Sequence, residues 1–133
     1  MRLVIAGGPR CGKTTRALEL AEEKGLRALH SDDLIGTHQH GDDSAEVARW
    51  FSKPGPWVAE GVTMARGLRK WLEQHQSGKP CDEIILMQRP VLQLTEGQAR
   101  MLKACNTVFA QIEPALRVRG VRVVKQSAGG DHG

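Results

Sequence analysis

Short apolar runs alternate along the chain with longer segments in which apolar residues recur every three or four positions. The apolar runs predict five strands, at residues 2–6, 26–30, 57–61, 82–87 and 121–125. The helical spacing predicts a helix from Arg16 to Lys24, one that starts at Asp43, one that carries Met64 and Leu68, and a long one after Thr95. Strands that alternate with helices favour a parallel sheet with helices on both faces. We therefore expect an α/β protein with three α/β/α layers and a mostly parallel five-stranded sheet.

Local signals mark the ends of the long last helix. Thr95 and Gln98 have the spacing of a capping box, in which each side chain satisfies a backbone amide of the other residue. Pro114 is expected to end or kink this helix, since proline lacks the amide hydrogen that a helix interior needs. The apolar side of the helix is predicted to consist of Met101, Leu102, Cys105, Val108, Phe109 and Ile112.

The length of 133 residues fits one domain, which we place at residues 1–126, followed by a flexible tail at residues 127–133. No apolar run is long enough to span a membrane, and none resembles a signal peptide. The three cysteines Cys11, Cys81 and Cys105 show no metal-binding spacing, so we interpret them as packing residues of a reduced protein. These features predict a cytoplasmic protein, in the host cytoplasm if a phage encodes it.

The segment after the first strand has the composition of a phosphate-binding loop. Glycines allow backbone amides to converge on phosphate oxygens, and a helix that follows offers its electropositive N-terminus. Lys13 is expected to contact the β- and γ-phosphates, and Thr14 to bind Mg²⁺. The residues expected to hold a nucleoside triphosphate are Gly7, Gly8, Pro9, Arg10, Cys11, Gly12, Lys13, Thr14 and Thr15.

Three carboxylates follow predicted strands at the sheet edge where α/β proteins place their chemistry. Asp32 and Asp33 follow the second strand, and Glu60 ends the third. A hydroxyl that attacks a γ-phosphate needs a base or an orienting acceptor, and Asp32 is the first candidate for that role. Asp33 and Glu60 stay open as alternatives, and Glu60 is equally suited to a structural role, either orienting Thr14 or pairing with an arginine. Asp32 is also a candidate Mg²⁺ ligand beside Thr14.

Together, residues 7–15, Ser31-Asp32-Asp33 and Val58-Ala59-Glu60-Gly61 resemble the small P-loop kinases, which include polynucleotide, gluconate and adenylylsulfate kinases. The Gly-Gly-Pro-Arg start and Leu94-Thr95-Glu96-Gly97-Gln98 are similar to compact bacteriophage P-loop kinases, such as those that phosphorylate 5-hydroxymethyluracil in DNA. This resemblance implies a P-loop NTPase fold, ATP and Mg²⁺ as cofactors, and Asp32 as the base toward an acceptor hydroxyl.

Kinases of this fold close an arginine-bearing lid over the triphosphate, and Arg100 is the main candidate for that role here. Arg89 and Lys103 lie in the same region, and Arg66 and Arg69 are alternatives for gripping an acceptor. Arg100, Lys103, Arg66 and Arg69 also fit a solvated helix face.

Two further groups of residues have simpler explanations. His38, His40, Asp42 and Asp43 match no defined metal spacing and are interpreted as a polar loop. The tryptophans Trp50, Trp57 and Trp71 are expected to pack in the core rather than stack on a base.

The sequence therefore predicts an ATP- and Mg²⁺-dependent kinase that acts on a hydroxyl of a nucleic acid or nucleotide. The formal charge of +4 suits a DNA partner but also suits an enzyme whose only anion is a nucleotide. The alternatives are an NTPase that hydrolyses ATP for regulation, a polynucleotide or small-metabolite kinase, and an ATP-binding module without catalysis.

Overall fold

A computed structural model of the chain describes residues 1–34, 43–90 and 92–126. Within these ranges, helices and strands alternate from the first strand onward. In chain order they are β1 (Arg2–Gly7), α1 (Lys13–Lys24), β2 (Arg27–His30), the 3₁₀ turn η1 (Ser31–Leu34), α2 (Asp43–Trp50), β3 (Trp57–Gly61), α3 (Met64–Gln74), β4 (Glu83–Met87), α4 (Glu96–Val118) and β5 (Arg122–Gln126).

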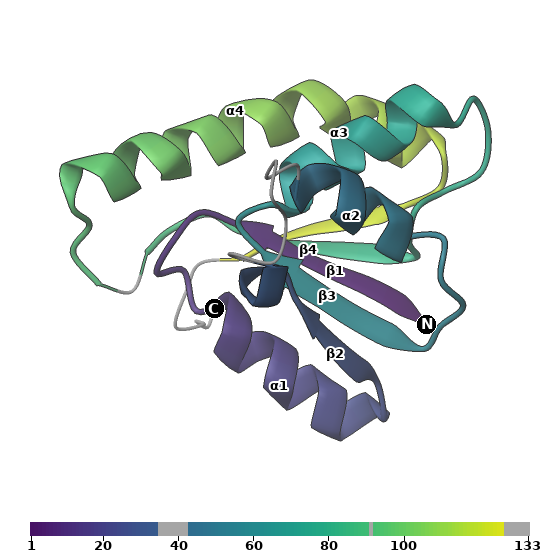
Figure 1. Cartoon of the computed structure of the whole chain (residues 1–133), viewed down its shortest axis with the longest axis horizontal. Helices are drawn as coiled ribbons and strands as arrows, with labels where there is room; N and C mark the ends of the chain where they lie inside the picture. The colour runs from purple at the N-terminus through teal and green to yellow at the C-terminus, as the bar shows by residue number, and fades with distance from the viewer. Residues whose placement is uncertain (35–42, 91, 127–133) are drawn as a thin grey trace.

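The five strands form one sheet in the order β2-β3-β1-β4-β5, and every pairing between neighbours is parallel (Figure 1). β1 lies in the centre, between β3 and β4. Parallel pairing brings the carboxyl ends of all strands to one edge, so Gly7, His30, Gly61 and Met87 end near one another. In open α/β sheets this edge is where ligands bind.

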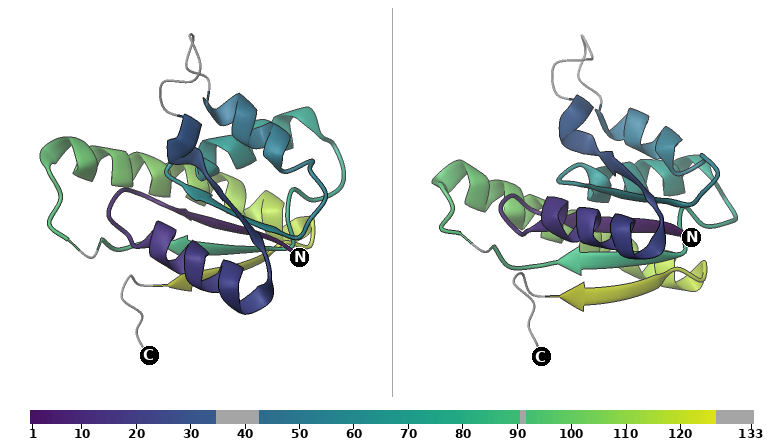
Figure 2. Two further views of the ribbon diagram at one scale, coloured as in Figure 1. Left: turned by 60° about the horizontal axis from the view of Figure 1, so that its bottom comes forward. Right: turned by 90° about the horizontal axis from the view of Figure 1, so that it is seen from below.

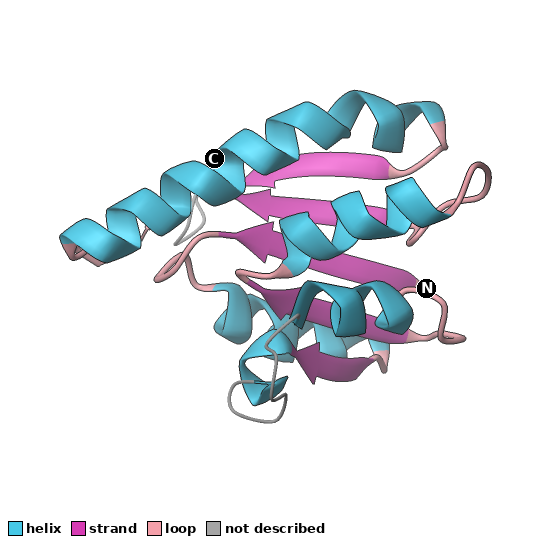
Figure 3. Ribbon diagram, turned by 45° about the horizontal axis from the view of Figure 1, so that its top comes forward, coloured by secondary structure: helices cyan, strands magenta, loops and turns pink. Residues whose placement is uncertain are grey.

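The helices cover both faces of the sheet, as predicted, but unequally. α1 packs on one face, where Ala17 and Leu20 contact Leu3, Val58 and other apolar residues of the strands (Figure 2). The helices α2, α3 and α4 cover the opposite face (Figure 3). The larger core lies under these three helices and includes Trp57, Phe51 and Phe109.

Most predicted elements are observed within one or two residues, and two helix boundaries differ. α1 begins at Lys13 rather than Arg16, because Gly12 takes a left-handed conformation at the N-cap and the chain turns directly into the helix. Pro114 does not end α4, which continues to Val118. Helix α4 starts at the predicted capping box of Thr95 and Gln98.

The predicted apolar side of α4 is only partly buried. Cys105, Phe109 and Ile112 are buried, but Met101 is 40% exposed. Figures 1 and 3 show the reason, since the N-terminal part of α4 extends past the carboxyl ends of the strands. This part of α4 therefore overhangs the carboxyl edge of the sheet.

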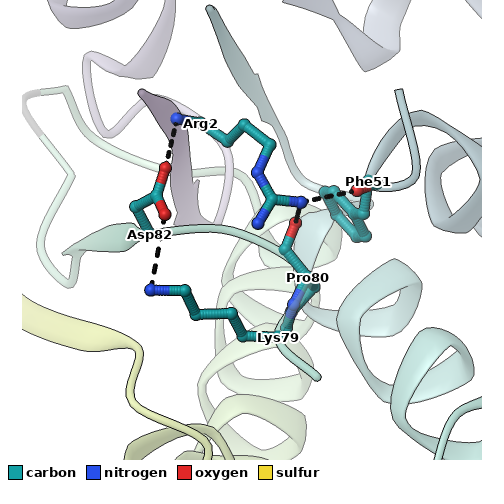
Figure 4. A network of polar contacts seen from close by, with 5 residues as sticks. All are labelled: Arg2, Phe51, Lys79, Pro80 and Asp82. Atoms are coloured by element: carbon teal, nitrogen blue, oxygen red, sulfur yellow. Dashed lines mark hydrogen bonds and ion pairs between the residues drawn. The ribbon is translucent and has the colours of Figure 1, made fainter. Parts of the chain in front are cut away.

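A polar network joins β1 and β4 at their amino ends, on the side of the sheet away from the carboxyl edge (Figure 4). The backbone amide of Arg2 donates to Oδ2 of Asp82 over 2.7 Å, and Lys79 Nζ lies 3.4 Å from Oδ1. The Arg2 guanidinium donates to the carbonyls of Phe51 and Pro80 over 3.2 and 3.4 Å. The Arg2 amide is the main reason that the pKa of Asp82 lies below its ordinary value. The network fixes the sheet at the end far from the predicted site.

The predicted tail at residues 127–133 and most of the polar loop with His38 and His40 lie outside the described residues. The three predicted packing cysteines are free thiols and are buried. The three tryptophans are also buried, as predicted. Within the described ranges, no helix combines the length and the apolar character needed to cross a membrane.

Candidate functional site

At the junction of the β1–α1 loop and α1, several backbone amides have no hydrogen-bond acceptor within the helix. The first amide of α1 that bonds to a carbonyl in helical fashion is that of Arg16, which donates to Gly12 O over 3.1 Å. The amides of Lys13, Thr14 and Thr15 precede it and have no acceptor within the helix. Gly12 has φ 80° and gives no side-chain cap to the helix. An anion at this end would supply the missing acceptor, which is how phosphate groups bind helix N-termini.

Lys13 points back into this loop. Its side chain is buried, with 7% of the residue exposed, and its Nζ donates a hydrogen bond to the Gly8 carbonyl. Burial lowers the pKa of Lys13, and the negative charges of Glu60 and Asp32 are among the neighbours that oppose this shift. A buried ammonium group among loop amides is an arrangement suited to phosphate oxygens.

Glu60 is the most buried carboxylate of the site and links three elements. Its residue is 2% exposed, and Oε2 accepts a hydrogen bond from Thr14 Oγ1 over 3.0 Å. The same oxygen lies 2.6 Å from Nδ1 of His30, at the end of β2. Because Thr14 gives its hydrogen to Glu60, the lone pairs of Oγ1 remain available for a cation. This geometry suits the interpretation in which Glu60 orients Thr14.

Asp32 and Asp33 are both exposed in η1, immediately after β2. Only Asp32 is among the charges that act on Lys13. Ser31 is buried between them and the sheet, and its Oγ has no hydrogen-bond partner among the described residues. Gly61 makes room for this serine, since a β-carbon on Gly61 would lie 1.6 Å from Ser31 Oγ.

Helix α4 packs directly on the phosphate-binding loop. A β-carbon on Gly8 would lie 2.6 Å from Cα of Leu102, so the helix backbone rests on the glycine. One turn further along α4, the Cys105 thiol donates to the Val62 carbonyl over 3.3 Å. Neither contact was predicted, because each joins residues that lie far apart in the sequence and that no spacing pattern along the chain relates.

The basic residues proposed for a lid lie near the site but outside its buried centre. Arg100 is on the overhanging part of α4, with its side chain 73% exposed and 3.4 Å from Glu96. Arg66 lies in the first turn of α3 and is close enough to Cys105 for its charge to act on that thiol. Arg10, Arg89 and Lys103 are exposed. A phosphate contact by any of these residues stays a prediction.

The geometry fits ATP and Mg²⁺ as expected. The amide-lined loop and Lys13 suit the phosphates, while oxygen atoms of Thr14, Glu60 and Asp32 are the hard donors that Mg²⁺ prefers. Mg²⁺ is commonly held by one or two protein oxygens together with substrate phosphates and water. The described ranges contain no group of three or more His, Cys, Asp or Glu residues placed to hold a metal ion.

Sequence reasoning did not assign a role to His30. The position of His30 could have indicated a role, because His30 directly precedes Ser31 and Asp32 at the end of a predicted strand. Its pairing with Glu60 depends on the register between β2 and β3, and that register is not readable from the spacing of residues along the chain.

Comparison with protein-family models and with curated proteins gives no match. Solved structures do match over nearly the whole chain. A shikimate kinase from Aquifex aeolicus has a TM-score of 0.57 at 12% identity, covering 98% of this chain and 89% of that one. A gluconokinase from Sinorhizobium meliloti has a TM-score of 0.56 at 17% identity, with 98% and 83% covered. Shikimate kinase from Acinetobacter baumannii, in complex with shikimate, has a TM-score of 0.55 at 18% identity, with 99% and 84% covered.

The chain therefore has the three-layer α/β fold of the small P-loop kinases. These similarities support the kinase-like fold and not the finer resemblance to phage kinases of 5-hydroxymethyluracil in DNA. The matched structures are named as shikimate kinases and a gluconokinase.

Proposed function

We propose that this chain is a Mg²⁺-dependent kinase that transfers the γ-phosphoryl group of ATP to a hydroxyl of a small molecule. The observation that carries the proposal is the meeting of three groups at one sheet edge. These are the buried Lys13 in the loop, the 3.0 Å hydrogen bond from Thr14 to Glu60, and Asp32, which lies in η1 directly after the carboxyl end of β2. The fold similarity to small-molecule kinases supports the choice of acceptor.

The residues divide into a donor side and an acceptor side. On the donor side, the loop amides and the Lys13 ammonium bind and orient the phosphates of ATP. Thr14 would hold Mg²⁺, with Glu60 fixing the Thr14 hydroxyl. Mg²⁺ supplies charge neutralisation on the phosphate oxygens.

On the acceptor side, Asp32 is exposed in η1 and can accept a hydrogen bond from an acceptor hydroxyl. A carboxylate in this position orients the attacking oxygen and takes its proton as the bond to phosphorus forms. Asp33 follows it in the same turn, and we assign this role to Asp32 because it is the carboxylate nearer along the chain to the end of β2.

The experiment is a transfer assay with labelled ATP, Mg²⁺ and a panel of sugars, hydroxy acids, nucleosides, ordinary DNA and DNA that contains 5-hydroxymethyluracil. We expect label on one class of small molecule. Asp32→Asn is expected to slow transfer about 100-fold or more, whereas Asp33→Asn, the matched control, changes it by less than about threefold. Equal losses in both variants would contradict the assignment to Asp32.

The DNA arm of the panel tests the acceptor expected from the sequence. The formal charge of +4 supports that expectation, because a basic protein attracts the phosphate backbone of DNA. Label on modified DNA and on none of the small molecules would replace the small-molecule acceptor with a DNA hydroxyl. Label released only to water would overturn the kinase function altogether.

A further inference from the structure

His30 lies in a chain of hydrogen bonds that reaches the nucleotide site. Its Nδ1 is 2.6 Å from Glu60 Oε2, and Thr14 Oγ1 is 3.0 Å from the same oxygen. The three residues come from β2, β3 and the first turn of α1, so the chain spans three separate elements. One carboxylate oxygen therefore connects an edge strand to the helix that follows the phosphate-binding loop.

The sheet itself places His30 on the correct side. In the parallel pairing of β2 with β3, His30 is the register partner of Glu60. Side chains alternate between the two faces of a strand, so Glu60 faces the same way as Val58, which is buried under α1. Ala28, two residues before His30, also packs on this side. His30 thus faces the Glu60 carboxylate beneath α1.

The hydrogen bonds leave one oxygen of Glu60 uncommitted. A carboxylate can only accept, so both Thr14 Oγ1 and His30 Nδ1 donate to Oε2. Oε1 has no hydrogen bond to any residue that the structure describes. With Oε2 held from two directions, the carboxylate plane has a fixed orientation, and Oε1 keeps a fixed direction within the site.

We propose that His30 is a positioning residue: its Nδ1–H holds the Glu60 carboxylate, which in turn holds the Thr14 hydroxyl for Mg²⁺. This inference rests on the proposed function. A buried carboxylate with few donors reorients to find others, because an unsatisfied charge is costly away from water. Residues that orient a metal ligand from behind typically change metal affinity 10- to 100-fold when they are removed.

His30→Asn and His30→Gln form a matched pair for the test. An asparagine amide nitrogen takes the place of Nδ1, and a glutamine amide nitrogen takes the place of Nε2, so only His30→Asn keeps the donor toward Glu60. The readout is the Kd of ADP by calorimetry, once with EDTA and once with Mg²⁺. The ratio of the two values measures how strongly Mg²⁺ supports nucleotide binding, and it does not require turnover.

We expect His30→Gln to reduce this ratio about tenfold while its Kd in EDTA stays within about twofold of wild type, and His30→Asn to keep most of the ratio. In the transfer assay, the same His30→Gln change should raise the Mg²⁺ concentration needed for half-maximal rate. A His30→Gln protein with the wild-type ratio would overturn the role of His30. Equal losses in His30→Asn and His30→Gln would also overturn it, since the position of the donor would then not matter.

The wild-type protein separates this inference from the proposed function. If wild type binds ADP no better with Mg²⁺ than with EDTA, the proposed function fails, and the role of His30 fails with it. If wild type shows the Mg²⁺ effect and His30→Gln retains it, only the role of His30 fails.

Discussion

Thr14 Oγ1 lies 3.0 Å from Glu60 Oε2, and this hydrogen bond connects the first turn of α1 to the end of β3. Glu60 is 2% exposed, so the bond is shielded from water. The hydroxyl of Thr14 gives its hydrogen to the carboxylate and keeps its lone pairs for a cation. Two functional groups that lie far apart in the sequence thereby form one unit, as the predicted role of Glu60 in orienting Thr14 requires.

Removing the Thr14 hydroxyl tests this unit. Thr14→Val keeps the shape of the side chain but has no oxygen, whereas Thr14→Ser keeps the oxygen. We expect Thr14→Val to weaken Mg²⁺-dependent nucleotide binding about 10- to 100-fold and Thr14→Ser to change it less than about threefold. Calorimetry with and without Mg²⁺ measures both. Equal binding by the two variants would show that the hydroxyl has no part in the site.

Lys13 is expected to act on the phosphates. Lys13→Met removes the buried ammonium group and keeps most of the apolar length of the side chain. We expect phosphoryl transfer to fall about 100- to 1,000-fold, as when a group that stabilises developing charge is lost. Lys24→Met, at the exposed end of the same helix, is the control and should leave transfer unchanged. A Lys13→Met protein that keeps wild-type transfer would remove Lys13 from the site.

The contact between α4 and the loop predicts an effect on stability. A β-carbon on Gly8 would lie 2.6 Å from Leu102 Cα and 2.8 Å from Leu102 Cβ, so Gly8→Ala must displace the helix or the loop. We expect Gly8→Ala to destabilise the fold by about 1–3 kcal/mol, measured by urea unfolding.

Gly97→Ala is the matched control in α4 itself. The nearest atom to its β-carbon would be in the Arg100 guanidinium, 4.0 Å away, so there is room for the methyl group. Alanine is favoured over glycine in a helix, and Gly97→Ala should leave stability unchanged or raise it by up to about 1 kcal/mol. If Gly8→Ala proves as stable as Gly97→Ala, α4 does not rest on the loop in solution.

The lowered pKa of Asp82 predicts how stability depends on pH. The Arg2 amide is the main cause of the lowering, so the folded state favours the ionised carboxylate. Its contribution is fully present above the ordinary carboxyl pKa and is lost as the pH falls through the lowered value. The Tm difference between wild type and Asp82→Asn should therefore shrink as the solution is acidified. The same series with Glu83→Gln, a neighbouring carboxylate, serves as the control, and a constant difference for Asp82→Asn would contradict the account.

Much of the fold was predictable because it depends on local signals. The apolar run at 57–61 coincides with β3, and the capping box at Thr95 marks the start of α4. Pro114 was expected to end or kink the helix, and α4 does not end there but continues to Val118. Met101 was placed on the apolar side of the helix from its spacing, but it is 40% exposed, because spacing does not show how far a helix extends beyond its sheet.

The phosphate-binding loop was predictable because its residue types follow from what phosphate requires. The contacts that hold this loop in place were not predictable from the sequence. The pairing of His30 with Glu60 depends on strand register, and the contact of Gly8 with Leu102 depends on how α4 crosses the sheet edge. Both are properties of the folded sheet and have no counterpart in the spacing of residues along the chain.

The most direct test of the central claim follows the fate of the γ-phosphoryl group. The protein is incubated with ATP, Mg²⁺ and a mixture of small hydroxylated compounds, and mass spectrometry identifies any compound that gains one phosphoryl group while free phosphate is measured in parallel. We predict one class of phosphorylated product with wild type, in an amount equal to the ADP formed, and none with Lys13→Met. Formation of ADP matched entirely by free phosphate, with no phosphorylated compound, would contradict the claim that the chain is a kinase.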